Sequence, residues 1–146
     1  MENLNIISNE ILEKLNNDSI IIEKSELQRD NKLLLITTKF LDSSNDLIEI
    51  LLYIEANNIF LCDNWLINNE FSLFFDNETI LNNIHKQCLN FPINQQFVYD
   101  DFLGIKNRRL ICETNIEQLE NDFLYFCQSI IKHLDLIKSY VIILGD

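Results

Sequence analysis

The stretch LLLITTKFLDSSNDLIEILLYIE, residues 33–55, places two apolar segments on either side of the polar sequence DSSND. Residues 33–38 and 47–55 are rich in β-branched and large apolar side chains, which favour buried strands. The Asp, Ser and Asn side chains between them favour a tight reversal because they bond to nearby backbone groups. The stretch therefore predicts two antiparallel strands joined by a surface turn.

The neighbouring segments extend this pattern. Residues 19–24 predict a short strand followed by a charged turn, and residues 59–62 predict another strand after a turn at 56–58. Because the connections are too short for parallel crossovers, these strands are expected to form an antiparallel meander. Ahead of them, apolar residues at helical spacing predict an amphipathic helix that ends near residues 16–17: Leu4, Ile7, Ile11, Leu12 and Leu15.

The C-terminal half predicts helices that alternate with strands. Residues 63–76 fit no clean period and are expected to form an irregular or short helical connector. Asp76 or Asn77 can cap the next helix, which ends before Pro92. The apolar residues of that helix are Ile80, Leu81, Ile84 and Cys88. Residues 96–102 and 109–113 predict two more strands, joined across residues 104–107.

A long last helix is predicted after these strands. Thr114 and Glu117 have the spacing of a capping box at its start, and the ending YVIILGD either continues the helix or forms a final strand. Its predicted apolar face comprises Leu119, Phe123, Phe126, Cys127, Ile130, Leu134 and Ile137. The complete order is helix, three to four strands, helix, two strands, helix. It predicts a single α+β domain over residues 1–146, with two layers in which helices cover an antiparallel sheet.

The charge of the chain is unevenly placed. The formal net charge is −12, and no lysine or arginine lies between Lys39 and Lys86. That interval contains Asp42, Asp46, Glu49, Glu55, Asp63, Glu70, Asp76 and Glu78. Such a surface repels nucleic acid and favours basic partners. No apolar run reaches the ~18 residues of a membrane span, and the first residues carry acids rather than a basic start, so we expect a cytoplasmic protein that does not contact membranes.

The candidate catalytic residues form no complete set. His85 and Cys88 share a predicted helix, and His133 with Cys127 gives a second, unrelated pair, but two ligands do not make a zinc site. The chain has no glycine-rich phosphate loop, and no local signature surrounds any of its four cysteines, which are expected to be reduced and mostly buried. Glu49 lacks the lysine that a two-acid nuclease motif places two residues later. We therefore expect a non-enzymatic protein without metal or cofactor. A metal-dependent nuclease-like enzyme is kept as a further alternative, because carboxylates could converge at one edge of the sheet: Asp42, Asp46 and Glu49 with Asp63.

Two clusters could contact a partner. Lys106, Arg108 and Arg109 lie near Tyr99 and Phe102, but three cations among so many acids favour a solvated hairpin over direct nucleic-acid binding. The connector that follows the meander contains four bulky aromatic residues flanked by acids, and it is either core or an exposed interface. The candidate contact residues are Asp42, Asp46, Glu49, Asp63, Trp65, Glu70, Phe74 and Phe75.

Residues 36–50, ITTKFLDSSNDLIEI, resemble an uncharacterised bacterial and phage family known only as a domain of unknown function. Its members read roughly I-T-T-P-F-L-D-R-x-N-D-x-I-x-I, followed by L-T-D-D-G-x-T-L. Here Lys39 replaces the proline, Ser43 the arginine and Trp65 the glycine, so the second motif survives only in Leu61 and Asp63. The resemblance implies an α+β domain associated with mobile elements and genomic regions dense in defence genes, with no established activity.

These observations lead to two classes of function. The first is a phage or mobile-element inhibitor that uses its acidic surface against the basic nucleic-acid channel of a host defence complex, as anti-CRISPR and anti-restriction proteins do. The second rests on a weaker similarity: dimeric acidic chaperones of the type III secretion class share the element order, the size and the low pI. The second class predicts a homodimer.

Overall fold

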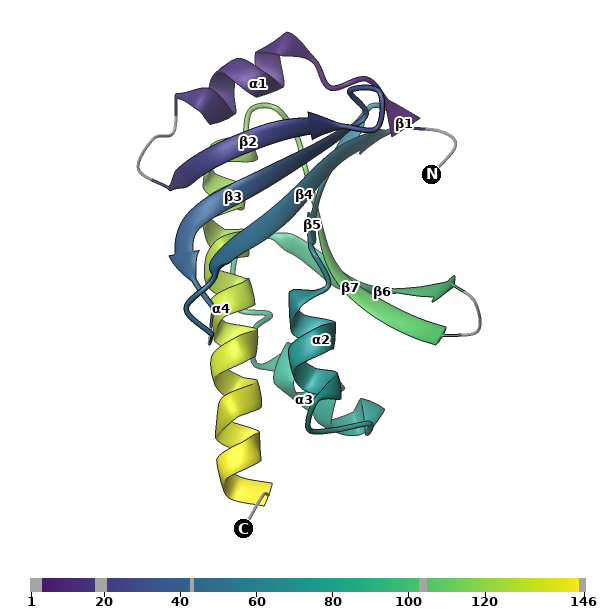
Figure 1. Cartoon of the computed structure of the whole chain (residues 1–146), viewed down its shortest axis with the longest axis vertical. Helices are drawn as coiled ribbons and strands as arrows, with labels where there is room; N and C mark the ends of the chain where they lie inside the picture. The colour runs from purple at the N-terminus through teal and green to yellow at the C-terminus, as the bar shows by residue number, and fades with distance from the viewer. Residues whose placement is uncertain (1–3, 18–20, 43, 103–104, 145–146) are drawn as a thin grey trace.

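The structure, a computed structural model, describes residues 4–17, 21–42, 44–102 and 105–144 (Figure 1). In these ranges one antiparallel sheet has the strand order β2-β3-β4-β5-β7-β6, and β1 pairs with β4. The strands are β1 (Leu4–Asn5), β2 (Ile22–Gln28), β3 (Leu33–Leu41), β4 (Leu47–Glu55), β5 (Asn58–Asp63), β6 (Asn94–Phe102) and β7 (Ile105–Thr114). The helices are α1 (Asn9–Asn16), α2 (Leu66–Ser72), α3 (Glu78–Lys86) and α4 (Leu119–Leu144). The predicted two-layer α+β fold is confirmed.

The hairpin of β3 and β4 forms where residues 33–55 predict it. Leu33 pairs with Tyr53 and Leu41 with Leu47, and β4 has the predicted bounds. Ala56 and Asn57, with φ of 51° and 67°, make the tight turn into β5. A short turn of this kind fixes the antiparallel register of β4 and β5, in which Glu55 pairs with Asn58.

All four helices lie on one face of the sheet. A single apolar core joins alternate residues of β4 to Leu15 of α1, Phe71 of α2, Leu81 of α3 and Phe123 of α4. Because side chains alternate between the faces of a strand, one shared core places these helices in one layer. The predicted apolar face of α4 is confirmed, since its seven residues are at most 3% exposed.

The N-terminal prediction is partly wrong. The helix begins only at Asn9, after Ser8 accepts a hydrogen bond from the Ile11 amide at 3.3 Å. Leu4 and Asn5 instead pair with Ile54 and Glu55 of β4. Leu4 is still buried, so the apolar residue was correctly assigned to the core but to the wrong element. The next strand runs through Gln28, into the segment predicted as a turn, and residues 18–20 lie outside the described ranges.

The last helix begins differently from its predicted capping box. Thr114 ends β7 and donates to Asp122 at 2.6 Å, while Asn115 accepts from the Gln118 amide at 2.9 Å. The side chain of Asn115 thus takes the capping role that the spacing of Thr114 and Glu117 suggested. The helix continues to Leu144, so residues 140–144 of the ending YVIILGD belong to α4 and not to a final strand.

Candidate functional site

The sheet face turned away from the helices carries apolar side chains. In β4 they alternate with buried Ile50 and Leu52, and the strand register aligns them in rows across β3, β4, β5 and β7. One row contains Leu35, Leu51, Cys62 and Ile111, and the next contains Leu33, Tyr53 and Phe60. We call these residues the open-face patch. At the usual strand spacing of about 4.8 Å, it extends about 14 Å from β3 to β7.

No helix within the described ranges packs over the open-face patch. None of its residues belongs to the core that joins the sheet to the helices, and Figure 1 shows β3 and β4 in front of α4. Four residues of the patch are half-buried and the other three are at most 6% exposed: Leu35, Leu51, Tyr53 and Phe60 in the first group, and Leu33, Cys62 and Ile111 in the second. The Tyr53 and Phe60 rings stack with centroids 5.3 Å apart. The patch is therefore shielded mainly by its own side chains.

Polar residues border this patch at the ends of its rows. Glu26 pairs with Leu35 at the β2 side, and Glu113 pairs with Phe60 at the β7 side. Glu49 lies two residues before Leu51 on the same face of β4, opposite Thr37. An apolar centre with a polar border is the usual composition of a protein interface.

A hollow of about 360 Å³ adjoins the patch at the Glu49 end. Its lining brings together three of the predicted contact residues, Asp42, Asp46 and Glu49. The remaining lining residues are Leu47, Asn64 and Leu66. The predicted convergence of carboxylates at this edge of the sheet is thus found for these three acids.

The DSSND turn is held by the side chain of Asp42. Its Oδ1 accepts hydrogen bonds from the amides of Ser44 at 2.8 Å and Asp46 at 3.0 Å. The Asp42 amide donates to the Asp46 carbonyl at 2.8 Å, and Asn45 adopts φ of 63°. Ser43 lies outside the described residues. The turn therefore uses the Asp42 carboxylate structurally and leaves the Asp46 side chain exposed.

Asp63 does not belong to this surface, contrary to the prediction. Its side chain is 1% exposed and accepts from the amides of Ile67 at 3.1 Å and Leu110 at 2.8 Å. Burial raises its pKa from 3.8 to about 6, although these two hydrogen bonds and the charge of Arg109 favour the ionised form. Asp63 therefore ties the start of α2 to β7 and is removed from the candidate contact residues.

Trp65 occupies a strained position next to the hollow. It precedes α2 with φ of 63°, a conformation that bulky residues rarely adopt. The Arg109 guanidinium carbon lies 5.0 Å from the centre of its ring, a cation–π contact that helps to offset the strain. Trp65 is half-buried, so it borders the surface without projecting from it.

The other predicted aromatic contacts separate in the structure. Phe75 packs against the core and its ring lies 5.4 Å from that of buried Phe71. Phe74, in contrast, is 53% exposed beside Leu73, which is 73% exposed. Glu70 on α2 is partly exposed. None of these residues lines the hollow, so the connector does not extend the acidic surface as one aromatic patch.

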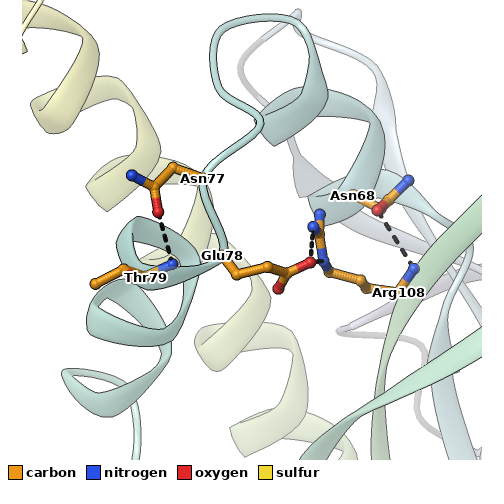
Figure 2. Close-up of polar contacts among 5 residues, drawn as sticks. All are labelled: Asn68, Asn77, Glu78, Thr79 and Arg108. Carbon is orange, nitrogen blue, oxygen red and sulfur yellow. Dashed lines mark hydrogen bonds and ion pairs between the residues drawn. The ribbon is translucent and has the colours of Figure 1, made fainter.

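The predicted basic cluster is also divided (Figure 2). Arg108 is only 9% exposed and forms an ion pair with Glu78 at the start of α3. Its amide donates to Asn68 of α2 at 3.3 Å, and Asn77 caps α3 through the Thr79 amide at 2.9 Å. Arg108 thus connects β7 to two helices, and it is not a solvated cation. The side chain of Lys106 lies outside the described part of the structure.

Two residues treated as unrelated in the sequence lie in contact. His85 of α3 and His133 of α4 approach with Nδ1 and Nε2 3.0 Å apart. Their separation of 48 residues gives no local signal of this contact. Within the first of the two histidine–cysteine pairs, the Cys88 thiol donates to the Ile84 carbonyl at 3.5 Å. Among the described residues, no group of three or more His, Cys, Asp or Glu side chains could hold a metal ion.

The open-face patch and the acidic hollow define a candidate protein-binding surface on an α+β domain. In the ranges that the structure describes, no helix has the length and apolar character needed to span a membrane. Comparison of the chain with protein-family models, curated proteins and solved structures finds no match.

Proposed function

We propose that this chain is a non-enzymatic protein-binding domain that contacts its partner through the open-face patch and the acidic hollow. The observation that carries the proposal is the apolar sheet face over which none of the described helices packs. The solvent-facing side of an antiparallel sheet normally alternates polar residues with the buried ones. Apolar rows that stay partly exposed and are bordered by charge instead mark interaction sites.

The charges beside the patch favour a basic partner. In the interval from Lys39 to Lys86, Asp63 is buried and Glu78 pairs with Arg108, whereas Asp42, Asp46 and Glu49 surround the hollow. Clustered carboxylates steer a basic surface into contact and disfavour acidic competitors. A protein surface that binds nucleic acid is basic, and its positive charge is complementary to the acidic hollow.

The biological setting that we propose is inhibition of a host defence complex by a phage or mobile-element protein of the anti-CRISPR or anti-restriction type. The chain would occupy the basic nucleic-acid channel of that complex. The resemblance of residues 36–50 to a family of mobile elements supports this setting. Trp65 gives additional support, because its φ of 63° is a conformation that suits glycine, the residue of the family motif at this position.

Charge reversal tests this proposal. Asp46→Lys with Glu49→Lys changes two acids at the hollow and raises the formal charge from −12 by four units, to −8. Glu13→Lys with Glu117→Lys makes the same change at exposed positions on the helix side. Binding to purified CRISPR effector and restriction nuclease complexes is measured as salt is raised.

We expect the hollow variant to bind at least ~10-fold more weakly than the wild type at low salt, and the helix-side variant to lose much less, because screening and orientation both act at the contact surface. Wild-type affinity should fall as salt rises. Affinity that is insensitive to salt and equal in the two variants would contradict the electrostatic interface.

The dimeric chaperone is the second candidate, and one feature of α4 favours it. Ile142, Ile143 and Leu144 at its C-terminal end are 70%, 71% and 55% exposed. Apolar helix surface of this kind could be buried in a homodimer. Light scattering after size exclusion distinguishes the candidates, because the chaperone requires a dimer whereas a strict monomer fits only the inhibitor.

A further inference from the structure

The contact between His85 and His133 fixes the position of their protons. His133 Nδ1 lies 2.7 Å from the Ser129 carbonyl oxygen, which can only accept, so this nitrogen carries the proton. In the neutral ring His133 Nε2 is then an acceptor, and the facing Nδ1 of His85 must donate to it at 3.0 Å. The pair is therefore a directed chain of hydrogen bonds from α3 to the backbone of α4.

This chain belongs to a larger buried network. The Ser129 hydroxyl donates to Gln95 Oε1 at 2.6 Å, and Gln95 Nε2 donates to the Cys88 carbonyl at 2.7 Å. Phe97 of β6 contacts both imidazoles, with ring centroids 4.7 Å from His85 and 5.6 Å from His133. Neutral histidines thus fasten α3 and the turn after it to α4 and β6.

The surroundings oppose positive charge on the pair. His133 is fully buried, and desolvation lowers its pKa from 6.5 to about 4; the charges of His85 and Lys132 act in the same direction, while the hydrogen bond to Ser129 acts against it. Desolvation also lowers the pKa of His85. Cys88, in the turn after α3, donates its amide to the His85 carbonyl; burial raises the pKa of its thiol to about 11, so this thiol remains neutral. The contacts from β6 come from neutral Gln95 and Phe97.

Protonation of both rings is therefore incompatible with the packed arrangement. One proton, taken up by Nε2 of half-buried His85, leaves the hydrogen bond between the rings in place. A second proton makes both facing nitrogens donors, and the bond between them is lost. The second charge lies on fully buried His133 and gains hydration only when the rings separate.

We propose that the His85–His133 pair is a proton-operated latch, which holds α3 and the turn containing Cys88 against α4 while neutral and releases them when it takes up protons. The device is independent of the proposed protein-binding surface. Histidine is the side chain whose ordinary titration range allows this response to mild acid.

The chain contains its own reporters of release. Cys88 is fully buried beside the latch, whereas Cys62 and Cys112 are fully buried in the central strands β5 and β7. Each thiol is labelled with dithiodipyridine over a range of pH, located by mass spectrometry, and its rate is divided by that of the urea-unfolded chain at the same pH. This ratio removes the intrinsic pH dependence of the thiol reaction.

We expect the normalised rate of Cys88 to rise as pH falls from 6.5 towards about 4, by about tenfold per pH unit for each proton taken up. Cys62 and Cys112 should remain unreactive over that range. The matched variant His85→Asn with His133→Gln retains polar groups at the contact but cannot titrate there, so its Cys88 rate should stay flat. An equal rise in the variant, no rise in the wild type, or simultaneous reaction of all these thiols would overturn the latch.

A measurement on the wild type does not depend on the variant's folding. The chain has two histidines, so the imidazole carbon–proton NMR spectrum contains signals from the latch alone. Both signals should titrate below pH 6.5, and each should respond to protonation of the other ring. Two independent titrations with ordinary midpoints would contradict the proposal.

Discussion

Replacing Asp63 with asparagine should change the pH dependence of stability in a defined direction. Burial raises the pKa of Asp63 from 3.8 in the unfolded chain to about 6 in the fold. Between these values the folded state binds more protons than the unfolded state, so the contribution of this group to stability falls as pH rises. At about 1.4 kcal/mol per pKa unit, the loss amounts to about 3 kcal/mol between pH 3.8 and pH 6.

Asparagine removes this proton linkage and retains only part of the hydrogen bonding. Its amide group cannot accept from both the Ile67 and Leu110 amides, which should cost about 1–3 kcal/mol at pH 3.8. Relative to the wild type, Asp63→Asn should therefore be clearly destabilised at pH 3.8, and should recover by about 3 kcal/mol near pH 7.

Urea unfolding of both proteins at a series of pH values measures this difference, and other groups that titrate alike in the two proteins cancel. A matched comparison is Asp46→Asn, which removes an exposed carboxylate from the same region. A difference between Asp63→Asn and the wild type that stays constant across the range, within about 0.5 kcal/mol, would refute the assignment of a buried, proton-linked carboxylate.

Three further predictions concern stability. Ile50→Ala should lower the free energy of unfolding by about 2–5 kcal/mol because Ile50 is fully buried in the core. Leu51→Ala should lower it by about 1 kcal/mol because Leu51 is half-buried on the open face. Equal losses in urea unfolding would show that the second face is covered too. Glu78→Gln should cost about 1–2 kcal/mol, because Arg108 is buried and its partner is partly exposed, and a thermal midpoint unchanged from the wild type would contradict the ion pair's role. Asp42→Ala should lose about 1 kcal/mol through the two turn hydrogen bonds, while Asp42→Asn, which keeps an acceptor, should lose less; the opposite order would refute the turn geometry.

The sequence predicts the β3–β4 hairpin well because apolar segments flank turn-forming residues between Leu33 and Glu55, although β3 continues to Leu41, three residues beyond the predicted strand. The same logic succeeds for α4, where buried residues recur at helical spacing over the whole face. The same pattern wrongly assigns Leu4 to the first helix, because a single apolar residue next to a helix fits a strand as well. Local pattern gives no information on which element such a residue pairs with.

The candidate site is only partly accessible from sequence, for two physical reasons. Continuous apolar residues in β4 predict a strand that is buried on both faces. The sequence therefore does not indicate that no described helix covers the face of Leu51 and Tyr53. The polar character of Asp63 suggests exposure, but two backbone amides from distant elements satisfy its carboxylate in the interior. The His85–His133 contact depends on helix packing across 48 residues, which no local spacing encodes.

The most direct test of the protein-binding surface is a hydrogen-exchange footprint of the wild-type chain, measured alone and with a purified nuclease effector complex. We expect slower exchange in the bound state for residues 44–53 and 58–66, which carry the hollow and part of the open-face patch, and unchanged exchange across α4. Protection confined to α4 would contradict the proposed binding surface. Exchange that is the same with and without the complexes of the charge-reversal experiment would contradict it as well.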